Sequence, residues 1–306
     1  GLQVTLLERG AEYLAGDFPT DLSQAAGFVR AEIHGRTGSN AVGNEDALFD
    51  FRLGDNATAL IGSGLGGGSL INAAVALQPD PRVIQQGPWP KVISEQGLSA
   101  DFAKASASLE VQSAQAQTAS SACVPQRTAK YQRMQQLGSA AAKDCASDKL
   151  SVRTEDVPLL IAFAERSDPE LPPRKACIGC GNCVSGCNQQ AKLSLDKTYL
   201  PKACQAGAQL FSRVSVLFIE HVDNDPEKPW RVHFARTSER AQWGALAQRQ
   251  TQLRKAGQPP EPALDAAIKA HCFSISCGRV VLAAGTFGSS EILLRSQALG
   301  LDISPT

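Results

Sequence analysis

Short apolar runs set between glycine-rich turns are the first feature of the sequence. The chain begins with "LQVTLLERG", whose apolar residues follow one another almost without interruption. Continuous apolar residues are typical of strands that are covered on both faces, as in a parallel sheet. Similar runs predict strands in "ALIG" from Ala59, "VPLLIAF" from Val157 and "RVVLAAG" from Arg279.

Polar stretches rich in alanine lie between these runs and predict helices. Residues 94–118 and 127–147 are rich in Ala, Ser, Gln and Lys. The segment "SLDKTYLPKACQAGAQLF" offers Ser194 or Asp196 as a helix cap and Gly207 as a stop, before a strand through Phe211. The run "RVVLAAG" continues into "TFGSSEILLRS", which predicts a turn followed by a helix.

The alternation of strands and helices predicts a three-layer α/β core. Two strand patterns, "VSVLFIEHV" and "WRVHFAR", flank a polar turn and predict a β-meander over residues 214–236. Residues 11–60 hold many Gly, Asn and Asp residues without a lasting period and predict irregular structure. Residues 238–270 are polar and predict an exposed helical hairpin or a disordered insertion.

Composition excludes some functions. The chain has 306 residues, with 30 basic and 30 acidic side chains, so its net charge is zero. A neutral chain argues against a nucleic-acid binder that relies on bulk positive charge. No apolar run approaches the roughly 20 residues that span a bilayer, so we expect no transmembrane segment. We expect a cytoplasmic location, although the missing initiator Met leaves a lost leader open.

Three glycine-rich or acidic elements have the character of nucleotide-binding turns. Glu8 closes the first strand, where an acid can accept hydrogen bonds from ribose hydroxyls. The loop "GSGLGGGSLIN" lets the backbone approach a ligand closely. It is not the primary dinucleotide fingerprint, because the acidic strand end comes before it rather than after it. The third element, "AAGTFG", lies between a predicted strand and a helix.

Four cysteines, spaced C-x2-C-x2-C-x3-C, form a compact run. They are Cys177, Cys180, Cys183 and Cys187. The spacing and the intervening glycines favour an iron–sulfur cluster, although bacterial ferredoxins have Pro where Asn188 stands here. Zinc or no metal remain alternatives. The scattered cysteines are expected to be small buried residues: Cys123, Cys145, Cys204, Cys272 and Cys277.

Taken in order, these segments resemble the glucose–methanol–choline family of flavin oxidoreductases, and within it the cholesterol-oxidase-like branch. The resemblance rests on "VTLLERG", "GSGLGGGSLINAAVALQP", "SLDKTYLPKACQAGA" and "VVLAAGTFGSSEILLRS". Members of this branch have a similar cysteine run just before the "DKTYL" segment. The resemblance implies an FAD/NAD(P)-binding Rossmann-like three-layer domain with a β-meander, plus an α+β portion of a substrate domain. It implies FAD-domain parts at 1–80 and 177–306, and a substrate or cap region at 81–176.

The resemblance also implies roles for individual residues. Glu8 would bind the adenosine ribose of FAD, and Val216 would contact the adenine through its main chain. The remaining FAD contacts fall in the glycine-rich loop and in the last turn: Gly64, Gly66, Gly67, Ser69, Asn72, Ala284, Gly285 and Gly288.

The family's pyrophosphate loop has no counterpart before Glu8, and its catalytic His is expected beyond residue 306. The resemblance therefore implies a fragment that is inactive alone, from an enzyme that oxidises a small-molecule alcohol, sterol-like or otherwise hydrophobic, and passes electrons to an external acceptor. An iron–sulfur centre would suit that transfer. The alternative is a non-catalytic iron–sulfur or zinc module of an electron-transfer or structural kind.

Overall fold

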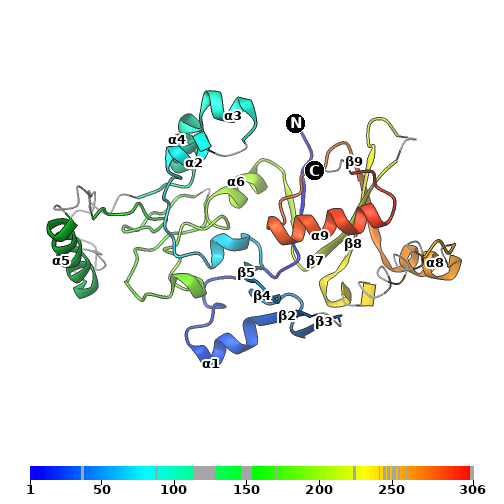
Figure 1. Cartoon of the computed structure of the whole chain (residues 1–306), viewed down its shortest axis with the longest axis horizontal. Helices are drawn as coiled ribbons and strands as arrows, with labels where there is room; N and C mark the ends of the chain where they lie inside the picture. The colour runs from blue at the N-terminus through cyan, green and yellow to red at the C-terminus, as the bar shows by residue number, and fades with distance from the viewer. Residues whose placement is uncertain are drawn as a thin grey trace. The chain divides into compact units, whose positions relative to one another are not determined.

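A computed structural model gives the fold of the chain (Figure 1). It describes residues 1–35, 38–86, 89–112, 128–145, 154–169, 171–222, 225–240 and 261–303, with short stretches between 242 and 259. The chain forms two compact units. The first comprises Gly1–Glu12, Ala26–Leu65 and Gly207–Thr306, and the second comprises Tyr13–Ala25 and Gly66–Ala206. Parallel and antiparallel strand pairs both occur, so the fold is mixed α/β.

The apolar run at the start of the chain forms strand β1 (Thr5–Leu7) of the first unit, as predicted. It pairs in parallel with β6 (Gln209–Phe211), with Leu6 opposite Leu210. The strand predicted through Phe211 is therefore confirmed. Beyond β1, the Glu8 N–H donates to the Phe211 carbonyl at 2.8 Å, so the pairing extends to the acid that closes the strand.

A four-stranded sheet occupies much of the segment predicted to be irregular, and that prediction is wrong. The strands are β2 (Val29–Gly35), β3 (Gly38–Gly43), β4 (Phe49–Leu53) and β5 (Thr58–Gly62), in the order β3-β2-β4-β5. The buried side chains of β2 and β4 include Arg30, Asp50 and Arg52. Charged residues occupy the inward positions of these strands. The sequence therefore lacks the alternation of apolar and polar residues by which a strand is recognised.

These buried charges form an ion network within the first unit. Asp50, which is fully buried, pairs with Arg9 and Arg30 at 2.8 and 2.9 Å and with Arg52 at 3.1 Å. Arg52 also reaches Glu32 at 2.6 Å. Buried charges are tolerated only when they are paired and hydrogen-bonded, which is the arrangement found here.

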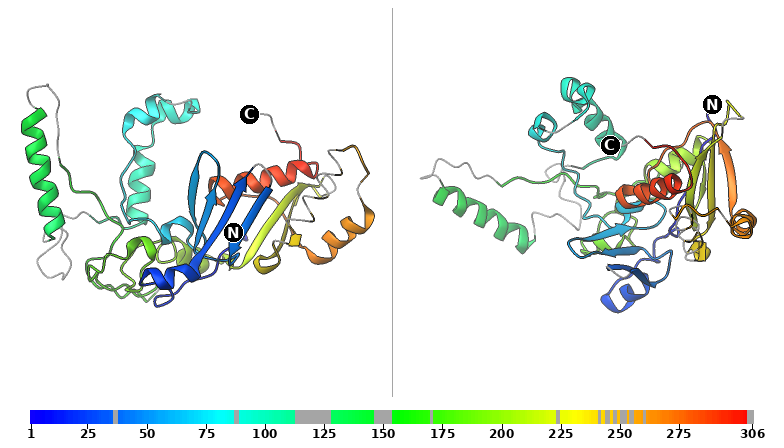
Figure 2. Two further views of the ribbon diagram at one scale, coloured as in Figure 1. Left: turned by 60° about the horizontal axis from the view of Figure 1, so that its bottom comes forward. Right: turned by 45° about the vertical axis from the view of Figure 1, so that its right-hand side comes forward.

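The third sheet is the predicted β-meander. It has the order β7 (Val214–His221), β8 (Trp230–Arg236), β9 (Phe273–Cys277), all antiparallel. Helix α9 (Gly285–Ala298) lies along this sheet (Figure 2), where Ile292 joins Ile219 and Val232 in one apolar cluster. Helix α8 (Pro262–His271) joins a separate cluster through Ile268, together with Leu217.

The last apolar run, "RVVLAAG" from Arg279, does not form the strand that was predicted for it. The helix after it is confirmed as α9, but residues 279–284 form no strand. Val280 and Leu282 pack into the cluster around Ile292, whereas Val281 is 79% exposed. A strand needs a neighbour for its backbone hydrogen bonds, and no described strand takes up this position.

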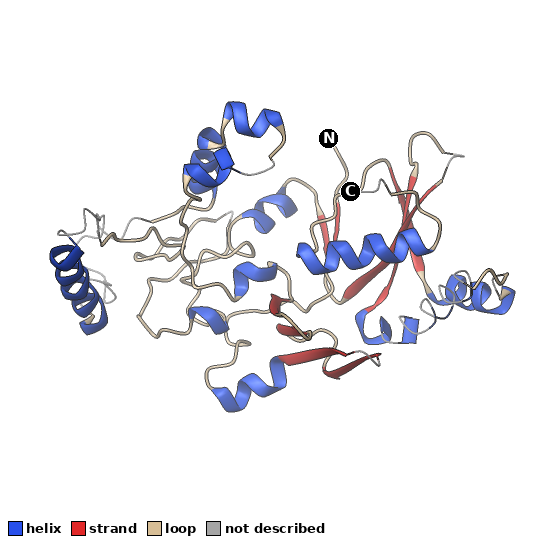
Figure 3. Ribbon diagram, viewed as in Figure 1, coloured by secondary structure: helices blue, strands red, loops and turns tan. Residues whose placement is uncertain are grey.

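The second unit consists of short helices and long connections (Figure 3). Its helices are α1 (Leu22–Ala25), α2 (Pro81–Gln86), α3 (Lys91–Gln96), α4 (Ser99–Ser108), α5 (Ala129–Asp144) and α6 (Tyr199–Gln205). Within the described residues of the two units, 3-10 turns occur at η1 (Ala26–Phe28), η2 (Gly67–Leu70), η6 (Cys183–Ser185) and η7 (Thr237–Glu239). The predicted helices at 94–118, 127–147 and after Ser194 are confirmed in part as α4, α5 and α6, and residues 113–118 lie outside the described ranges.

The strand predicted from Val157 is wrong. This segment makes only isolated bridges, Val75 with Leu159 and Ile161 with Lys192. Leu160 and Leu193 nevertheless lie in the apolar core of the second unit, beside Ala74. The apolar run therefore reflects burial alone, because its backbone meets several short segments rather than one long neighbour.

No helix in the described ranges is long and apolar enough to cross a membrane. Helix α5, for example, has 16 residues and carries several charged side chains. The predicted domain boundaries near residues 80 and 176 stay a prediction.

Candidate functional site

Glu8 lies where β1 ends, in the first unit. Its carboxylate oxygen Oε1 accepts hydrogen bonds from the backbone N–H groups of Gly10 at 2.7 Å and Gly64 at 3.2 Å. Burial raises the pKa of Glu8, and the same two N–H groups together with Arg9 oppose that rise. Both backbone donors use one oxygen, so the carboxylate is held in place and can accept from a ligand hydroxyl through Oε2.

The backbone after β1 runs beside the start of the glycine-rich loop. Leu65 N–H donates to the Ala11 carbonyl at 2.9 Å. A Cβ atom on Gly10 would lie only 2.2 Å from the Gly64 nitrogen, so a larger residue does not fit there. The structure therefore brings together two of the three predicted nucleotide-binding elements, the acidic strand end and the glycine-rich loop.

Val216 lies at a β-bulge of β7, where the register shifts between Val216 and Phe218. Arg295 of α9 donates to the carbonyl of Leu217 at 2.6 Å and to that of Val216 at 3.3 Å. Ser296 accepts the Ile219 N–H at 2.9 Å. Helix α9 thus satisfies the backbone groups around the bulge, and the Val216 carbonyl already has a protein partner.

The third predicted element begins α9. Ala284 precedes the helix, and Gly285 opens it with φ +69°, a left-handed conformation that favours glycine. The Ala284 N–H donates to the Ser289 hydroxyl at 3.2 Å. Gly288 lies in the first turn, where an added Cβ would come within 2.9 Å of the Ala284 side chain.

The other half of the glycine-rich loop belongs to the second unit. Gly66 and Gly67 lead into η2, and Gly66 has φ +119°. The Ser69 hydroxyl donates to the Gly66 carbonyl at 2.6 Å and accepts the Leu195 N–H at 3.0 Å. The Asn72 side chain accepts the N–H of Ala74 at 3.1 Å. Ser69 and Asn72 therefore fix the local path of the loop.

Lys192 was not predicted from the sequence, yet it is the buried charge beside this loop. Its ammonium donates to the carbonyls of Leu70 at 2.9 Å, Asn72 at 2.7 Å and Cys183 at 2.8 Å. Burial lowers the pKa of Lys192 to about 8, against the attraction of Cys183, Cys187 and Asp196. Lys192 follows the polar stretch "NQQA", so the local sequence carries no signal of burial.

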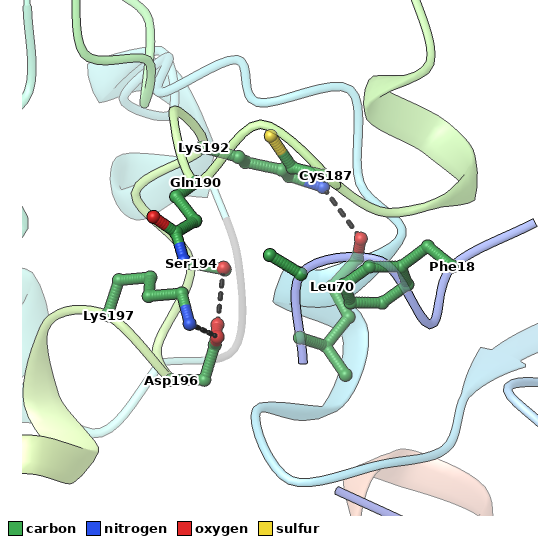
Figure 4. Close-up of a pocket in the computed structure, with 9 residues that line it drawn as sticks. Phe18, Leu70, Cys187, Gln190, Lys192, Ser194, Asp196 and Lys197 are labelled. Atoms are coloured by element: carbon green, nitrogen blue, oxygen red, sulfur yellow. Dashed lines mark hydrogen bonds and ion pairs between the residues drawn. The ribbon is translucent and has the colours of Figure 1, made fainter. Parts of the chain in front are cut away.

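A small cavity in the second unit borders Lys192 (Figure 4). Its volume is about 10 Å³, room for a single water molecule at most. Ser194 donates a hydrogen bond to Asp196, and the Lys197 ammonium lies 3.0 Å from the same carboxylate. The cavity is lined by Ala15, Phe18, Leu70, Cys187, Gln190, Lys192, Ser194, Asp196 and Lys197. It is too small for an organic substrate.

The cysteine run gives no support to the predicted metal site. None of Cys177, Cys180, Cys183 and Cys187 forms a disulfide, and the described residues hold no group of three or more His, Cys, Asp or Glu side chains suited to a metal ion. Burial raises the pKa of Cys183, and the neighbouring Cys187 and Cys180 add to the rise, whereas Lys192 opposes it. The iron–sulfur cluster, and zinc as its alternative, therefore stay predictions without support from the described residues.

The scattered cysteines only partly follow the prediction of burial. Cys145, Cys272 and Cys277 are half-buried, whereas Cys204 is exposed. Cys123 lies outside the described residues.

The end of the cysteine run is anchored by the side chain of Asn188. Its side-chain oxygen accepts the N–H groups of Gly16 at 2.8 Å and Phe18 at 3.1 Å, and its amide donates to the Phe18 carbonyl at 2.8 Å. Gly186 faces the Phe18 ring so closely that a Cβ atom would lie 2.0 Å from it. The run therefore fits tightly against residues 16–18.

Comparison with known proteins relates the chain distantly to cholesterol oxidases. No family model matches it. It is 25% identical over 226 residues to cholesterol oxidase of Acinetobacter baumannii, covering 72% of the chain and 37% of that protein. It is 30% identical over 129 residues to cholesterol oxidase of two Mycobacterium tuberculosis strains, CDC 1551 / Oshkosh and H37Rv, covering 42% of the chain and 17% of each. The chain thus matches a little over a third of the length of the Acinetobacter protein, and less of the others.

Proposed function

We propose that the chain is part of an FAD-dependent oxidoreductase of the glucose–methanol–choline type, which oxidises the CH–OH group of a hydrophobic alcohol. The observation that carries the proposal is the Glu8 carboxylate, fixed at the end of β1 by the N–H groups of Gly10 and Gly64. The distant similarity to cholesterol oxidases supports it and favours a sterol-like substrate.

The residues around Glu8 fit the ribose of a dinucleotide. The carboxylate is an acceptor at a strand end, and the nearby loop is built from glycines that allow close backbone approach. Its charge suits ribose hydroxyls and opposes a phosphate at the same place. We therefore assign Glu8 to the adenosine ribose of FAD.

The other contacts are proposed in the same way. Gly64, Gly66 and Gly67 supply backbone to the flavin and its ribityl chain, with Ser69 and Asn72 on the same loop. Val216 offers main-chain contact to the adenine, for which its N–H is the relevant group because Arg295 engages its carbonyl. The turn that holds Ala284, Gly285 and Gly288 is the second place where the backbone approaches FAD.

FAD, when bound, accepts hydride from the carbon that bears the hydroxyl group. The described residues bind and orient this cofactor, and we assign none of them to removal of the hydroxyl proton. The four histidines are not placed in that role, and the base is proposed to lie beyond residue 306. Electrons would leave to an external acceptor, molecular oxygen or another.

A spectrum of the purified protein tests the proposal. The complete reading frame that encodes this chain is expressed, and flavin absorbance is recorded without oxygen before and after addition of cholesterol, a long-chain alcohol and a short alcohol. The proposal expects bound flavin that is bleached by at least one hydrophobic alcohol. A protein without flavin, or with flavin that no alcohol reduces, contradicts it.

The same preparation tests the metal prediction. We route no electrons through an iron–sulfur centre, because the described residues hold no group of three or more side chains suited to a metal ion. Iron, acid-labile sulfide and zinc are measured on anaerobically purified protein. Stoichiometric iron and sulfide would support the alternative of an electron-transfer module and would require the cysteine run to rearrange.

A further inference from the structure

Lys192 joins two segments of the second unit through one ammonium group. Leu70 and Asn72 belong to the glycine-rich loop, and Cys183 belongs to the cysteine run. An ammonium has three N–H donors, and each has a carbonyl partner within 2.9 Å. Figure 4 shows the bond from Lys192 to the Leu70 carbonyl at the edge of the small cavity.

The backbone that carries Lys192 is held on both sides. Ala162 N–H donates to the Ala191 carbonyl at 2.7 Å, and Leu193 N–H donates to the Leu160 carbonyl at 2.9 Å. Leu193 is itself in the apolar core. The side chain therefore starts from a fixed point, and its reach sets where the three carbonyls can lie.

Because Lys192 is buried, loss of these three hydrogen bonds would be costly for the free energy of the folded state. The Lys192 residue is only 3% exposed, so neither the ammonium nor its carbonyl partners can readily exchange them for water. Removal of the ammonium would leave up to three backbone acceptors without a donor. The loop between Gly66 and Asn72 buries Leu70, and polar ties to Lys192 and to Leu195 hold its backbone on either side of that residue.

We propose that Lys192 is a positioning residue that sets the backbone of the glycine-rich loop and couples that loop to the cysteine run. The inference rests on the proposed function, in which this loop contacts the flavin. Lys192 acts through the carbonyls of Leu70 and Asn72. Because all three of its N–H groups are engaged by the protein, it has no role as a nucleophile.

The proposal gives the cysteine run a use that needs no metal. Through the Cys183 carbonyl, the run becomes the second anchor of the loop. Binding of flavin at the loop should therefore stiffen the cysteine run as well, whereas a run that is merely folded nearby would not respond.

The test compares three variants of the complete protein. Lys192→Met keeps the length of the side chain but removes its charge and its N–H donors. Lys192→Arg keeps the charge and the N–H donors. Lys175→Met is the matched control, because Lys175 is an exposed lysine just before the cysteine run. Flavin affinity, the circular dichroism of bound flavin and its midpoint potential are measured for each.

We expect Lys192→Met to bind flavin about tenfold more weakly or worse, through loss of buried hydrogen bonds. Its flavin dichroism should change and its midpoint potential should fall, because a positive charge near the cofactor is lost. Lys192→Arg should restore part of the affinity, and Lys175→Met should match the wild type. Wild-type values for all three properties in Lys192→Met overturn the proposal.

A measurement on the unmodified protein covers the case in which Lys192→Met does not fold. Hydrogen–deuterium exchange is compared with and without flavin, and slower exchange in residues 177–187 upon flavin binding is expected. Unchanged exchange there, with protection confined to the loop, overturns the proposal. A wild-type protein that binds no flavin contradicts the proposed function and this inference together, whereas wild-type flavin binding with an unaffected Lys192→Met contradicts the inference alone.

Discussion

Gly64 donates its backbone N–H to the Glu8 carboxylate at 3.2 Å, across 56 residues of sequence. The bond joins an acidic strand end to a glycine-rich loop, two features that are recognisable separately in the sequence. Their contact gives the proposed ribose site its geometry, because it fixes the carboxylate relative to the loop backbone.

The first prediction concerns the charge of Glu8. Glu8→Gln keeps an oxygen for Gly10 and Gly64 but removes the negative charge and can turn an amide donor toward the ribose. We expect FAD affinity to fall by about tenfold or more, since a hydrogen bond to a charged group contributes roughly 1.5–3 kcal/mol. Titration of the apoprotein with FAD, followed by flavin fluorescence, measures this. Glu12→Gln, at an exposed acid four residues on, is the control; equal affinity in Glu8→Gln and wild type would contradict the assignment.

A second prediction follows from the close approach of Gly10 to the loop. Gly10→Ala would place a Cβ atom 2.2 Å from the Gly64 nitrogen, so one of the two backbone segments must move. We expect a loss of about 1–3 kcal/mol in the free energy of unfolding, together with weaker FAD binding. Urea denaturation measures the first effect. Gly27→Ala is the matched control, because a Cβ at Gly27 meets nothing within 4 Å; a similar small change in both variants would argue against the tight approach.

The ion network of the first unit predicts acid sensitivity. Burial alone would raise the pKa of Asp50, but Arg9, Arg52 and Arg30 outweigh it and hold that pKa below its ordinary value of 3.8. Folding therefore favours the ionised form. The stabilisation is fully present above the unfolded pKa and is lost as the pH falls through the lower folded pKa. Unfolding free energy measured from about pH 6 downward should thus fall below about pH 4.

Substitution of Asp50 gives the same network a mutational test. Asp50→Asn leaves the buried guanidinium groups of Arg30 and Arg52, and the half-buried one of Arg9, with less negative charge. We therefore expect a loss of about 3–5 kcal/mol and a weaker pH dependence. Asp55→Asn, at an exposed acid between β4 and β5, should leave both unchanged. An Asp50→Asn protein with wild-type stability at pH 7 would show that the network contributes little.

The anchor at Asn188 provides a further prediction. Asn188→Ala removes three hydrogen bonds to the backbone of Gly16 and Phe18, and we expect a loss of about 1–3 kcal/mol. Asn188→Asp keeps both accepting bonds and loses only the donation to the Phe18 carbonyl, so its stability should lie between those of Asn188→Ala and wild type. Thermal unfolding of the three proteins measures the order. If Asn188→Asp were the least stable, repulsion between its carboxylate and the Phe18 carbonyl would dominate instead.

Local patterns predicted some elements well. The run before Glu8, the β-meander and helix α9 are set by apolar residues that bury against close neighbours, and their sequences carry that period. Strands β2 and β4 were missed because Arg30, Asp50 and Arg52 point inward, where an alternating pattern would have apolar side chains, whereas β5 was predicted from the run at Ala59. The run from Val157 was misread because burial of its side chains does not require a strand ladder.

For the candidate site too, some features could be predicted from the sequence and others could not. The sequence by itself marked Glu8, the glycine-rich loop and the turn before α9 as candidates, because an acid at a strand end and clustered glycines are typical of nucleotide-binding turns. Only the tertiary structure decided that Gly64 reaches Glu8, that Lys192 holds the loop through Leu70, and that Asn188 anchors the cysteine run to residues 16–18. These are contacts between distant segments, and their energies depend on burial and on which backbone groups lack other partners. A linear sequence records neither of these before the chain has folded.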